Sequence, residues 1–383
     1  MTDSSTAPAA LTDQLRTALG QVIDPELHRS ITDLDMVGAI AVDASGQATI
    51  EFQLTTEACP LRYQLVTDIE RVASALPGVT GVTVEVGTMN DDQRAALRDK
   101  LGAGAGPEIP FARPDSSTRV IAVASGKGGV GKSSITANLA TTLSSAGHSV
   151  GVIDADIYGH SLPRLFGVEP DDGPTRVEGM DFVLPVTVKG VKLMSIGMMK
   201  PEPDDVIAWR GPVVSRALMQ FLTEVYWGDL DFLLIDLPPG TGDVAMSIGQ
   251  ALPNAEILVV TTPQLAATEV AERAGTMADL MKQRVIGVIE NMSYLDTVCP
   301  HCGQSHRVDV FGSDGGQTVA TDLTRRLGYE VPLLGQIPLA PDWRAAGDAG
   351  TPLVLTSREP AAVALAEVAE KITRMGRALS PVG

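Results

Sequence analysis

The stretch ASGKGGVGKSS, residues 124–134, constrains the fold of this chain more than any other feature. It matches the pattern G-x-x-x-x-G-K-[ST], with Gly126, Gly131, Lys132 and Ser133 at the defining positions. An apolar run precedes it and the helix-forming run SSITANLATTLSSAG follows it, which is the strand–loop–helix context that a phosphate loop requires. The sequence therefore predicts a nucleoside triphosphate site in which loop N–H groups and a helix N-terminus bind the phosphates.

Within this loop we expect Lys132 to reach the terminal phosphates and Ser133 to coordinate Mg²⁺. The residues expected to contact the nucleotide are Gly126, Lys127, Gly128, Gly129, Val130, Gly131, Lys132, Ser133 and Ser134. The first lysine of the stretch, Lys127, is not needed by the phosphate-loop pattern itself. The presence of Lys127 indicates a more specific class of phosphate loop than the general pattern defines.

Acidic residues follow two later apolar runs. Asp236 ends LLID and is expected to hold Mg²⁺ through water, as a Walker B carboxylate does. Asp156, in VIDADIYG, is our candidate catalytic residue for orienting the attacking water, while Asp154 either organises the loop or the metal shell or acts on the water itself. Gly240 and Gly242 would let the backbone approach the γ-phosphate or serve a turn.

Apolar runs alternate with helical patterns from residue 119 to residue 383. Most of these runs are unbroken rather than alternating, as in strands of a parallel sheet that is covered on both faces. We therefore predict a doubly wound, mostly parallel α/β P-loop NTPase domain over residues 119–383. A small α+β domain is predicted over residues 1–100, and the Gly-, Ala- and Pro-rich residues 101–118 are predicted to form a flexible linker.

The charge and the cysteine content narrow the function classes. The formal net charge is −18, and no run of Lys or Arg forms a basic patch, so we expect no nucleic acid and no membrane partner. The first residues lack the basic and apolar regions of a signal peptide. Only three cysteines occur, which suits a reducing cytoplasm.

Two of the cysteines, Cys299 and Cys302, have C-x-x-C spacing. Three interpretations remain open: a redox dithiol, a zinc site in one chain that adds His301 or His306, and a four-thiolate site shared by two chains. The shared site suits zinc or a [4Fe–4S] cluster alike. The third cysteine, Cys59, lies in the EACP stretch of the small domain, which resembles the αβ module of iron–sulphur assembly factors. The resemblance implies a contact for a transient cluster or a partner, and a structural role is the alternative.

The loop sequence KGGVGKS, residues 127–133, resembles the deviant Walker A motif of the MinD/ParA/nitrogenase-iron-protein group of ATPases. In that group the early lysine is a signature residue that reaches the nucleotide across a dimer interface. The resemblance therefore implies that Lys127 is a catalytic residue for the partner's nucleotide, where it neutralises charge on the transferred phosphoryl group.

From about residue 10 onward the chain resembles the Mrp/ApbC family of iron–sulphur cluster carrier ATPases. The motifs that carry the resemblance are DPELHRSITDLDMV, TTEACP, ASGKGGVGKSS, DADIYGHS, IDLPPGTGD, IENMSY, CPHCG and GQIPL. The resemblance implies a homodimer in which Cys299 and Cys302 of each subunit bridge a [4Fe–4S] cluster. It also implies that Asn291 contacts the adenine ring of ATP.

The function implied by this resemblance is transfer of clusters to apo iron–sulphur proteins, with a cluster-assembly scaffold as a further partner. ATP hydrolysis would be slow and would serve the transfer. The alternatives are a ParA/MinD-like positioning ATPase and a zinc-stabilised scaffold whose ATP site is regulatory.

Overall fold

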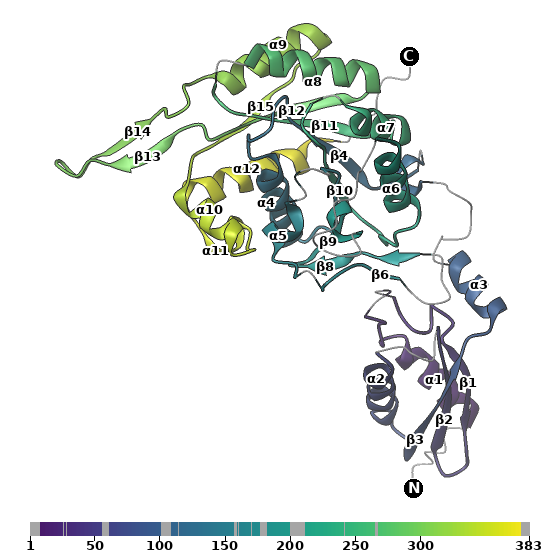
Figure 1. Cartoon of the computed structure of the whole chain (residues 1–383). Helices are drawn as coiled ribbons and strands as arrows, with labels where there is room; N and C mark the ends of the chain where they lie inside the picture. Colours follow the sequence, from purple (N-terminus) through teal and green to yellow (C-terminus); the bar gives the residue numbers. More distant parts are fainter. Residues whose placement is uncertain are drawn as a thin grey trace. The chain divides into compact units, whose positions relative to one another are not determined.

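The computed structural model describes residues 8–25, 27, 29–55, 61–100, 109–113, 115–156, 159, 161–169, 171–176, 182–199, 211–240, 242–264 and 267–376 (Figure 1). The chain divides into two compact units, which are described separately. The first comprises residues 1–107 and 176–184, and the second comprises residues 108–175 and 185–383.

The first unit is built on a three-stranded sheet in the order β1-β2-β3. Its elements are α1 (Pro8–Leu19), β1 (Val37–Val42), β2 (Gln47–Leu54), α2 (Arg62–Ser74), β3 (Gly81–Thr88) and α3 (Asp91–Lys100). Strands β1 and β2 form an antiparallel hairpin, and β3 runs parallel to β2 after the α2 crossover. Helix α2 buries Leu65, Ile69 and Ala73, which are spaced four residues apart and therefore share one face. The α+β class expected for this region is confirmed.

The second unit is built on an eight-stranded sheet in the order β15-β12-β11-β4-β10-β5-β9-β8. Strand β8 is antiparallel to β9, and the other neighbouring strands are parallel. The strands are β4 (Arg119–Ala124), β5 (Val150–Asp154), β8 (Val186–Val188), β9 (Val191–Ser195), β10 (Phe232–Asp236), β11 (Glu256–Thr261), β12 (Arg284–Asn291) and β15 (Leu333–Ile337). Every residue of β4, β5, β10 and β11 is buried, as the unbroken apolar runs predicted.

Helices cover both faces of this sheet (Figure 1). One layer contains α4 (Lys132–Ser145) packed against α12 (Pro360–Arg374), with the short helices α5 (Leu162–Phe166), α10 (Pro341–Asp348) and α11 (Leu353–Thr356) beside them. The other layer is a continuous series of contacts from α6 (Gly211–Thr223) through α7 (Asp243–Ala251) and α8 (Ala267–Met281) to α9 (Gly315–Leu327). The doubly wound, mostly parallel α/β fold predicted from the sequence is therefore confirmed.

Four short strands and two 3₁₀ turns, η1 (Pro110–Ala112) and η2 (Ile196–Met199), complete the described structure. The strands are the pair β6 (Thr175–Arg176) and β7 (Val183–Leu184), and the hairpin β13 (Leu295–Val298) and β14 (Ser305–Val308). In Figure 1 this hairpin extends away from the sheet and helices of the second unit. Among the described residues, none of the helices has both the length and the apolar character needed to cross a membrane.

Part of the segment predicted as a linker packs on the second unit. Residues 101–108 lie outside the described residues, but Pro110–Ala112 form a 3₁₀ turn, η1. The Phe111 side chain is buried, and its ring meets that of Trp227 edge-on at a centroid distance of 6.5 Å. An aromatic anchor of this kind contributes burial that a freely flexible linker would lack. The described end of the segment is thus part of the folded unit.

Candidate functional site

The predicted phosphate loop joins β4 to α4 at the carboxyl edge of the sheet. Gly129 and Gly131 have φ values of +78° and +79°, a backbone region that other residues rarely adopt. A Cβ at residue 131 would also lie 2.4 Å from the amide nitrogen of Asn291, so only glycine fits there. The loop encloses a cavity of about 210 Å³, which residues 127–134 line together with Ser125, Asp156, Ser161 and Pro239.

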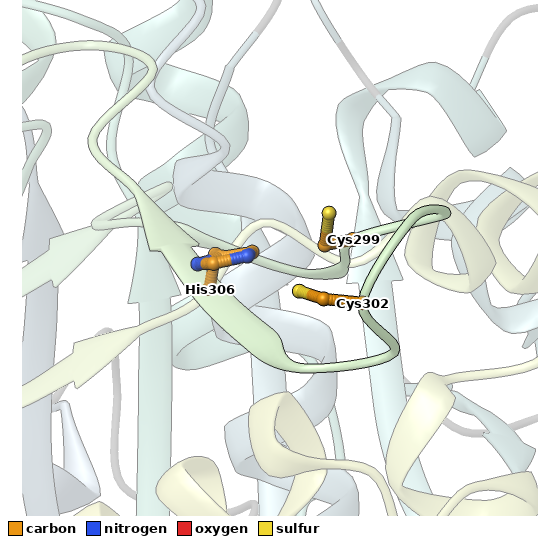
Figure 2. Close-up of side chains that lie close together, drawn as sticks. All are labelled: Cys299, Cys302 and His306. Carbon is orange, nitrogen blue, oxygen red and sulfur yellow. The ribbon is translucent and has the colours of Figure 1, made fainter.

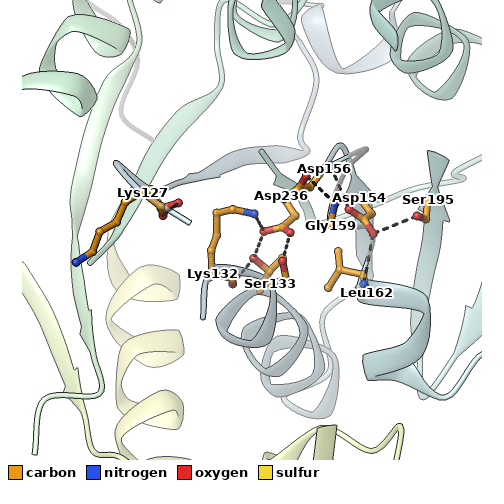
Figure 3. Close-up of polar contacts among 11 residues, drawn as sticks. Lys127, Lys132, Ser133, Asp154, Asp156, Gly159, Leu162, Ser195 and Asp236 are labelled. Atoms are coloured by element: carbon orange, nitrogen blue, oxygen red, sulfur yellow. Dashed lines mark hydrogen bonds and ion pairs between the residues drawn. The ribbon is translucent and has the colours of Figure 1, made fainter. Parts of the chain in front are cut away.

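Lys132 and Asp236 face each other at the base of this cavity (Figure 3). The Lys132 Nζ atom lies 2.7 Å from Asp236 Oδ1, and both side chains are buried, at 6% and 0% exposure. This buried ion pair occupies one N–H of the ammonium, and the remaining N–H donors have no acceptor among the described residues. A buried donor left in this way is costly unless a ligand accepts from it. Phosphate oxygens in the cavity would supply that acceptor.

Two hydroxyl groups hold the Asp236 carboxylate in place. Ser133 Oγ donates to Asp236 Oδ2 at 2.6 Å, and Thr136 Oγ1 donates to Oδ1 at 2.9 Å. The hydroxyl of Ser133 and the carboxylate of Asp236 are hard oxygen donors beside the phosphate cavity, which is the donor set that Mg²⁺ prefers. The residues present therefore fit a magnesium ion. Thr136 was missed by the sequence reasoning, although its position one helical turn after Lys132 places it on the same helix face.

Asp154 is paired with Asp236 in the register of β5 and β10. Burial, together with the neighbouring Asp236 carboxylate, raises the pKa of Asp154 to about 7. Its carboxylate accepts from Ser195 Oγ at 3.1 Å, from the backbone N–H of Leu162 at 3.3 Å and from that of Asp156 at 3.2 Å (Figure 3). These contacts assign Asp154 to organising the loop that follows β5.

Asp156 itself is only partly buried and lines the phosphate cavity. Its Oδ1 accepts from the backbone N–H of Gly159 at 3.1 Å. Of the two aspartates in this stretch, Asp156 is therefore the one that lines the phosphate cavity.

Lys127 does not join Lys132 and Asp236. Its ammonium donates to the side chain of Gln264, in the segment after β11, and Figure 3 shows it directed away from the other labelled residues. The backbone of Lys127 still follows the phosphate cavity, while the charged end of its side chain is exposed. Within one chain this cation is thus unavailable to the phosphates that Lys132 would bind.

A second cavity of about 390 Å³ adjoins the phosphate loop and shares Gly131, Ser134 and Ser161 with the first. Its lining includes Pro338, Leu339 and Trp343, which offer apolar surface to a flat ring. Asn291, at the end of β12, also lines it and donates from Nδ2 to the carbonyl of Val130 at 2.9 Å. The cavity has the position and lining expected for a nucleoside. Trp343 carried no motif, so the sequence reasoning missed it.

Gly240 and Gly242 lie between β10 and α7. Gly240 has a φ of +92°, and its N–H donates to the carbonyl of Ser125 at 3.0 Å, which ties this segment to the start of the phosphate loop. Gly242 is the N-cap residue of α7. Both glycines therefore have a turn role in the structure.

The C-x-x-C pair lies in the turn of the β13–β14 hairpin. The N–H of Cys299 donates to the carbonyl of Gln304, and the N–H of Gly303 donates to the carbonyl of Cys299, both at 2.9 Å. Gly303 has a φ of +68°, which the turn requires. The two strands that carry this turn were not predicted from the sequence, because β13 and β14 are four residues each and largely exposed.

Three potential metal ligands meet at this turn (Figure 2). The Sγ atoms of Cys299 and Cys302 and a ring nitrogen of His306 lie within 4.8 Å of one another. Hydrogen bonds from the backbone of Cys302 and of His301, with a contribution from His306, lower the pKa of the Cys299 thiol to about 7. A thiol with this pKa is substantially ionised near neutral pH, and the thiolate is the form that binds metal. Cys59 lies outside the described residues.

Comparison with known proteins identifies both parts of the chain. Residues 116–373 match the family model of the NUBPL iron-transfer P-loop NTPases, and residues 12–86 match the model of an iron–sulphur cluster assembly protein. The first of these ranges covers more than half of the chain.

Relatives and a solved structure agree with these matches. The chain is 52% identical over 359 residues to the iron–sulphur cluster carrier protein of Mycobacterium tuberculosis, covering 94% of this chain and 92% of the relative. It is 37% identical to the carrier protein of Bacillus subtilis, covering 94% of this chain and 97% of the relative. A nucleotide-binding protein from Archaeoglobus fulgidus, solved with ADP, superposes with a TM-score of 0.51 at 35% identity, covering 64% of this chain and 90% of that one.

These matches confirm the resemblance that the motifs indicated. The chain belongs to the NUBPL-type iron-transfer P-loop NTPases, in a form that carries an iron–sulphur cluster assembly domain ahead of the NTPase domain.

Proposed function

We propose that this protein carries a [4Fe–4S] cluster between two copies of its chain, delivers it to apo iron–sulphur proteins, and couples delivery to ATP binding and hydrolysis. One observation carries the proposal: the cysteine hairpin is exposed and offers two thiols, whereas a [4Fe–4S] cluster takes four thiolates. Residues 108–383 contain no other cysteine. A second copy of the hairpin would supply the missing pair.

The surface of the hairpin supports pairing of two chains. Val298, Val308 and Val310 are 61%, 44% and 48% exposed beside the cysteine turn. Exposed apolar side chains clustered at one site are typical of a surface that another protein covers. A two-fold axis at the turn would place the same valines on both sides of the interface and bring the two Cys299–Cys302 pairs together.

The phosphate loop supports ATP binding and hydrolysis. Its N–H groups and Lys132 would bind the phosphates, and Asn291 and Trp343 would contact the nucleoside. Ser133 and Asp236 would hold a Mg²⁺ ion, which would supply positive charge beside the β- and γ-phosphates. Asp156 would hold the attacking water, and the Lys127 ammonium of the partner subunit would stabilise the transferred phosphoryl group. Hydrolysis would be slow because a lone chain lacks this second cation.

The chemistry of the iron–sulphur cluster indicates which proteins donate it and which receive it. A labile cluster must come from an assembly scaffold and go to an apoprotein, and neither step needs nucleic acid or a membrane. An exposed thiol pair stays reduced only in a reducing compartment, so we place the protein in the cytoplasm. The names of its relatives, iron–sulphur cluster carrier proteins, support the carrier role.

Anaerobic reconstitution with ferrous iron and sulphide tests the proposal. The wild-type protein should bind about four iron atoms and four sulphides for every two chains. Cys299→Ala should bind essentially none, whereas Cys59→Ala, which removes a thiol outside the hairpin, should match the wild type. Equal uptake by the wild type and Cys299→Ala would overturn the proposal.

A further inference from the structure

The cysteine turn presents a third ligand that the four-thiolate cluster does not use. His306 lies on β14, opposite Thr297 in the register of the hairpin, and its ring nitrogen is within 4.8 Å of both cysteine sulphurs. The other imidazole of the turn, that of His301, is not part of this group. All three donors come from one short segment of one chain, so the group exists before any second copy arrives.

The separations of the donors suit a tetrahedral cation. Thiolate bonds of about 2.3 Å at tetrahedral angles place donor atoms roughly 3.7 Å apart. Closing from 4.8 Å or less to that value needs only rotation of side chains, since the two backbone hydrogen bonds across the turn already fix the Cα positions. His306 and Cys302 are exposed, so neither side chain must leave a packed environment to close on the ion.

We infer that the hairpin of a single chain binds one thiophilic divalent cation of the Zn²⁺ class through Cys299 Sγ, Cys302 Sγ and a ring nitrogen of His306, with the fourth coordination position open. Two thiolates and a neutral imidazole balance the charge of such an ion, and sulphur with imidazole selects Zn²⁺ over Mg²⁺ or Ca²⁺. An open fourth position makes this site exchangeable rather than purely structural.

The inferred site uses the same two cysteines as the proposed cluster but does not rest on that proposal. A cation held by Cys299, Cys302 and His306 occupies both thiolates of one chain, so the cation and the bridged cluster exclude each other. Divalent cation binding is thus a cluster-free state of the carrier, and His306 is the residue that distinguishes the two states.

Titration of the metal-free, reduced full-length protein with Co²⁺ under anaerobic conditions tests the inference. The wild type should bind about one Co²⁺ per chain with thiolate-to-cobalt charge-transfer bands and the intense visible bands of four-coordinate cobalt. His306→Ala should lower the Co²⁺ affinity at least about tenfold, since it removes a direct ligand. His301→Ala is the matched control and should stay within about twofold of the wild type, because its imidazole is outside the group.

Cluster reconstitution of the same variants separates this inference from the proposed function. His306→Ala should still take up the cluster, because four thiolates suffice for it. Binding of one Co²⁺ per two chains with sulphur-only ligation, or equal Co²⁺ affinity in His306→Ala and the wild type, would overturn the inference. A wild-type protein that binds Co²⁺ as expected yet takes up no cluster would instead overturn the proposed function and leave the cation site standing.

Discussion

The phosphate loop and the cysteine hairpin are built in opposite ways. The loop begins at a fully buried central strand, and its key side chains, Lys132 and Asp236, are almost inaccessible. The hairpin extends from the body of the second unit, and its strands and thiols are largely exposed (Figure 1). The first site is nearly complete in one chain, while the second offers two thiols, half of the four that the proposed cluster takes.

This difference shows that the site made of buried side chains is more complete within one chain than the site made of exposed ones. A buried phosphate site is shaped by strands and helices that the core already fixes, so under the proposed function it needs from outside only its ligand and the Lys127 ammonium of the partner subunit. An exposed pair of thiols has few neighbours to complete it, so its chemistry depends on what binds there. Variants that affect one site and spare the other therefore test the comparison directly.

The largest expected effect is that of Lys132→Ala. Removing this ammonium takes away a direct phosphate ligand and leaves the Asp236 carboxylate without its cation, so ATP hydrolysis should fall at least about 1000-fold. ATP affinity should fall with it, measured by calorimetry alongside phosphate release. Cluster uptake should be unchanged, since Cys299 and Cys302 lie in the hairpin turn and Lys132 lies in the phosphate loop. A parallel loss of cluster uptake would show that the two sites are not separable.

Lys127→Ala should lower hydrolysis at least about 100-fold while leaving ATP affinity within about threefold, because a cation supplied by a partner acts mainly in the transition state. Mixing Lys127→Ala and Lys132→Ala proteins sharpens the test. A mixed dimer has one intact loop that faces one intact Lys127, so the two inactive proteins should recover activity together. Absence of recovery in dimers shown to have exchanged subunits would contradict a shared site.

A smaller effect is expected at the hairpin. The pKa of Cys299 is lowered to about 7, so its thiolate forms as the pH rises through about 7 rather than near 9. Alkylation of Cys299 by iodoacetamide, followed by peptide mapping, should be half-maximal near that pH. At pH 7 the rate should be roughly tenfold that of the same residue in the urea-unfolded chain. If the alkylation rate depended on pH identically in the folded and unfolded chains, the turn would not lower the pKa of this thiol.

The smallest effect concerns the buried carboxylates. The folded-state pKa of Asp154, about 7, lies above its ordinary value of 3.8, so the folded protein holds a proton that the unfolded chain releases. This contribution to stability is complete below about pH 4 and is lost as the pH rises to about 7. Asp154→Asn removes the titration. The melting temperature of Asp154→Asn, relative to that of the wild type, should therefore rise by a few degrees between about pH 5 and pH 8. Melting temperatures that change in parallel with pH in the two proteins would contradict a buried, titrating Asp154.

Most of the fold could be predicted from the sequence because the patterns that indicate its strands and helices are local. The runs at β4, β10 and β11 are apolar throughout, so a covered parallel sheet was the natural prediction. The loop residues were predictable for the same reason, since glycines and lysine at fixed spacing dictate a backbone that binds phosphate.

Contacts between segments far apart in the sequence were not predictable in this way. Ser195 bonds to Asp154 across forty-one positions. Trp343 meets the loop only through the packing of the domain. The choice of His306 over His301 depends on the strand register of an exposed hairpin, which carries no apolar pattern to reveal it.

The link between Asn291 and the hairpin has a mechanical consequence. Asn291 ends β12 with its amide on the phosphate loop, and only Met292, Ser293 and Tyr294 separate it from β13. Ser293 N–H donates to Ile337 and the Tyr294 carbonyl accepts from Leu339, so this connector is clamped along its length to the chain that leaves β15. The three connecting residues span about 10 Å at most, so Asn291 and the first residue of the hairpin stay close together. Under the proposed function, this connector is a short, stiff link between the nucleotide site and the base of the cysteine hairpin, so inserting glycines into it should abolish the effect of ATP on cluster delivery.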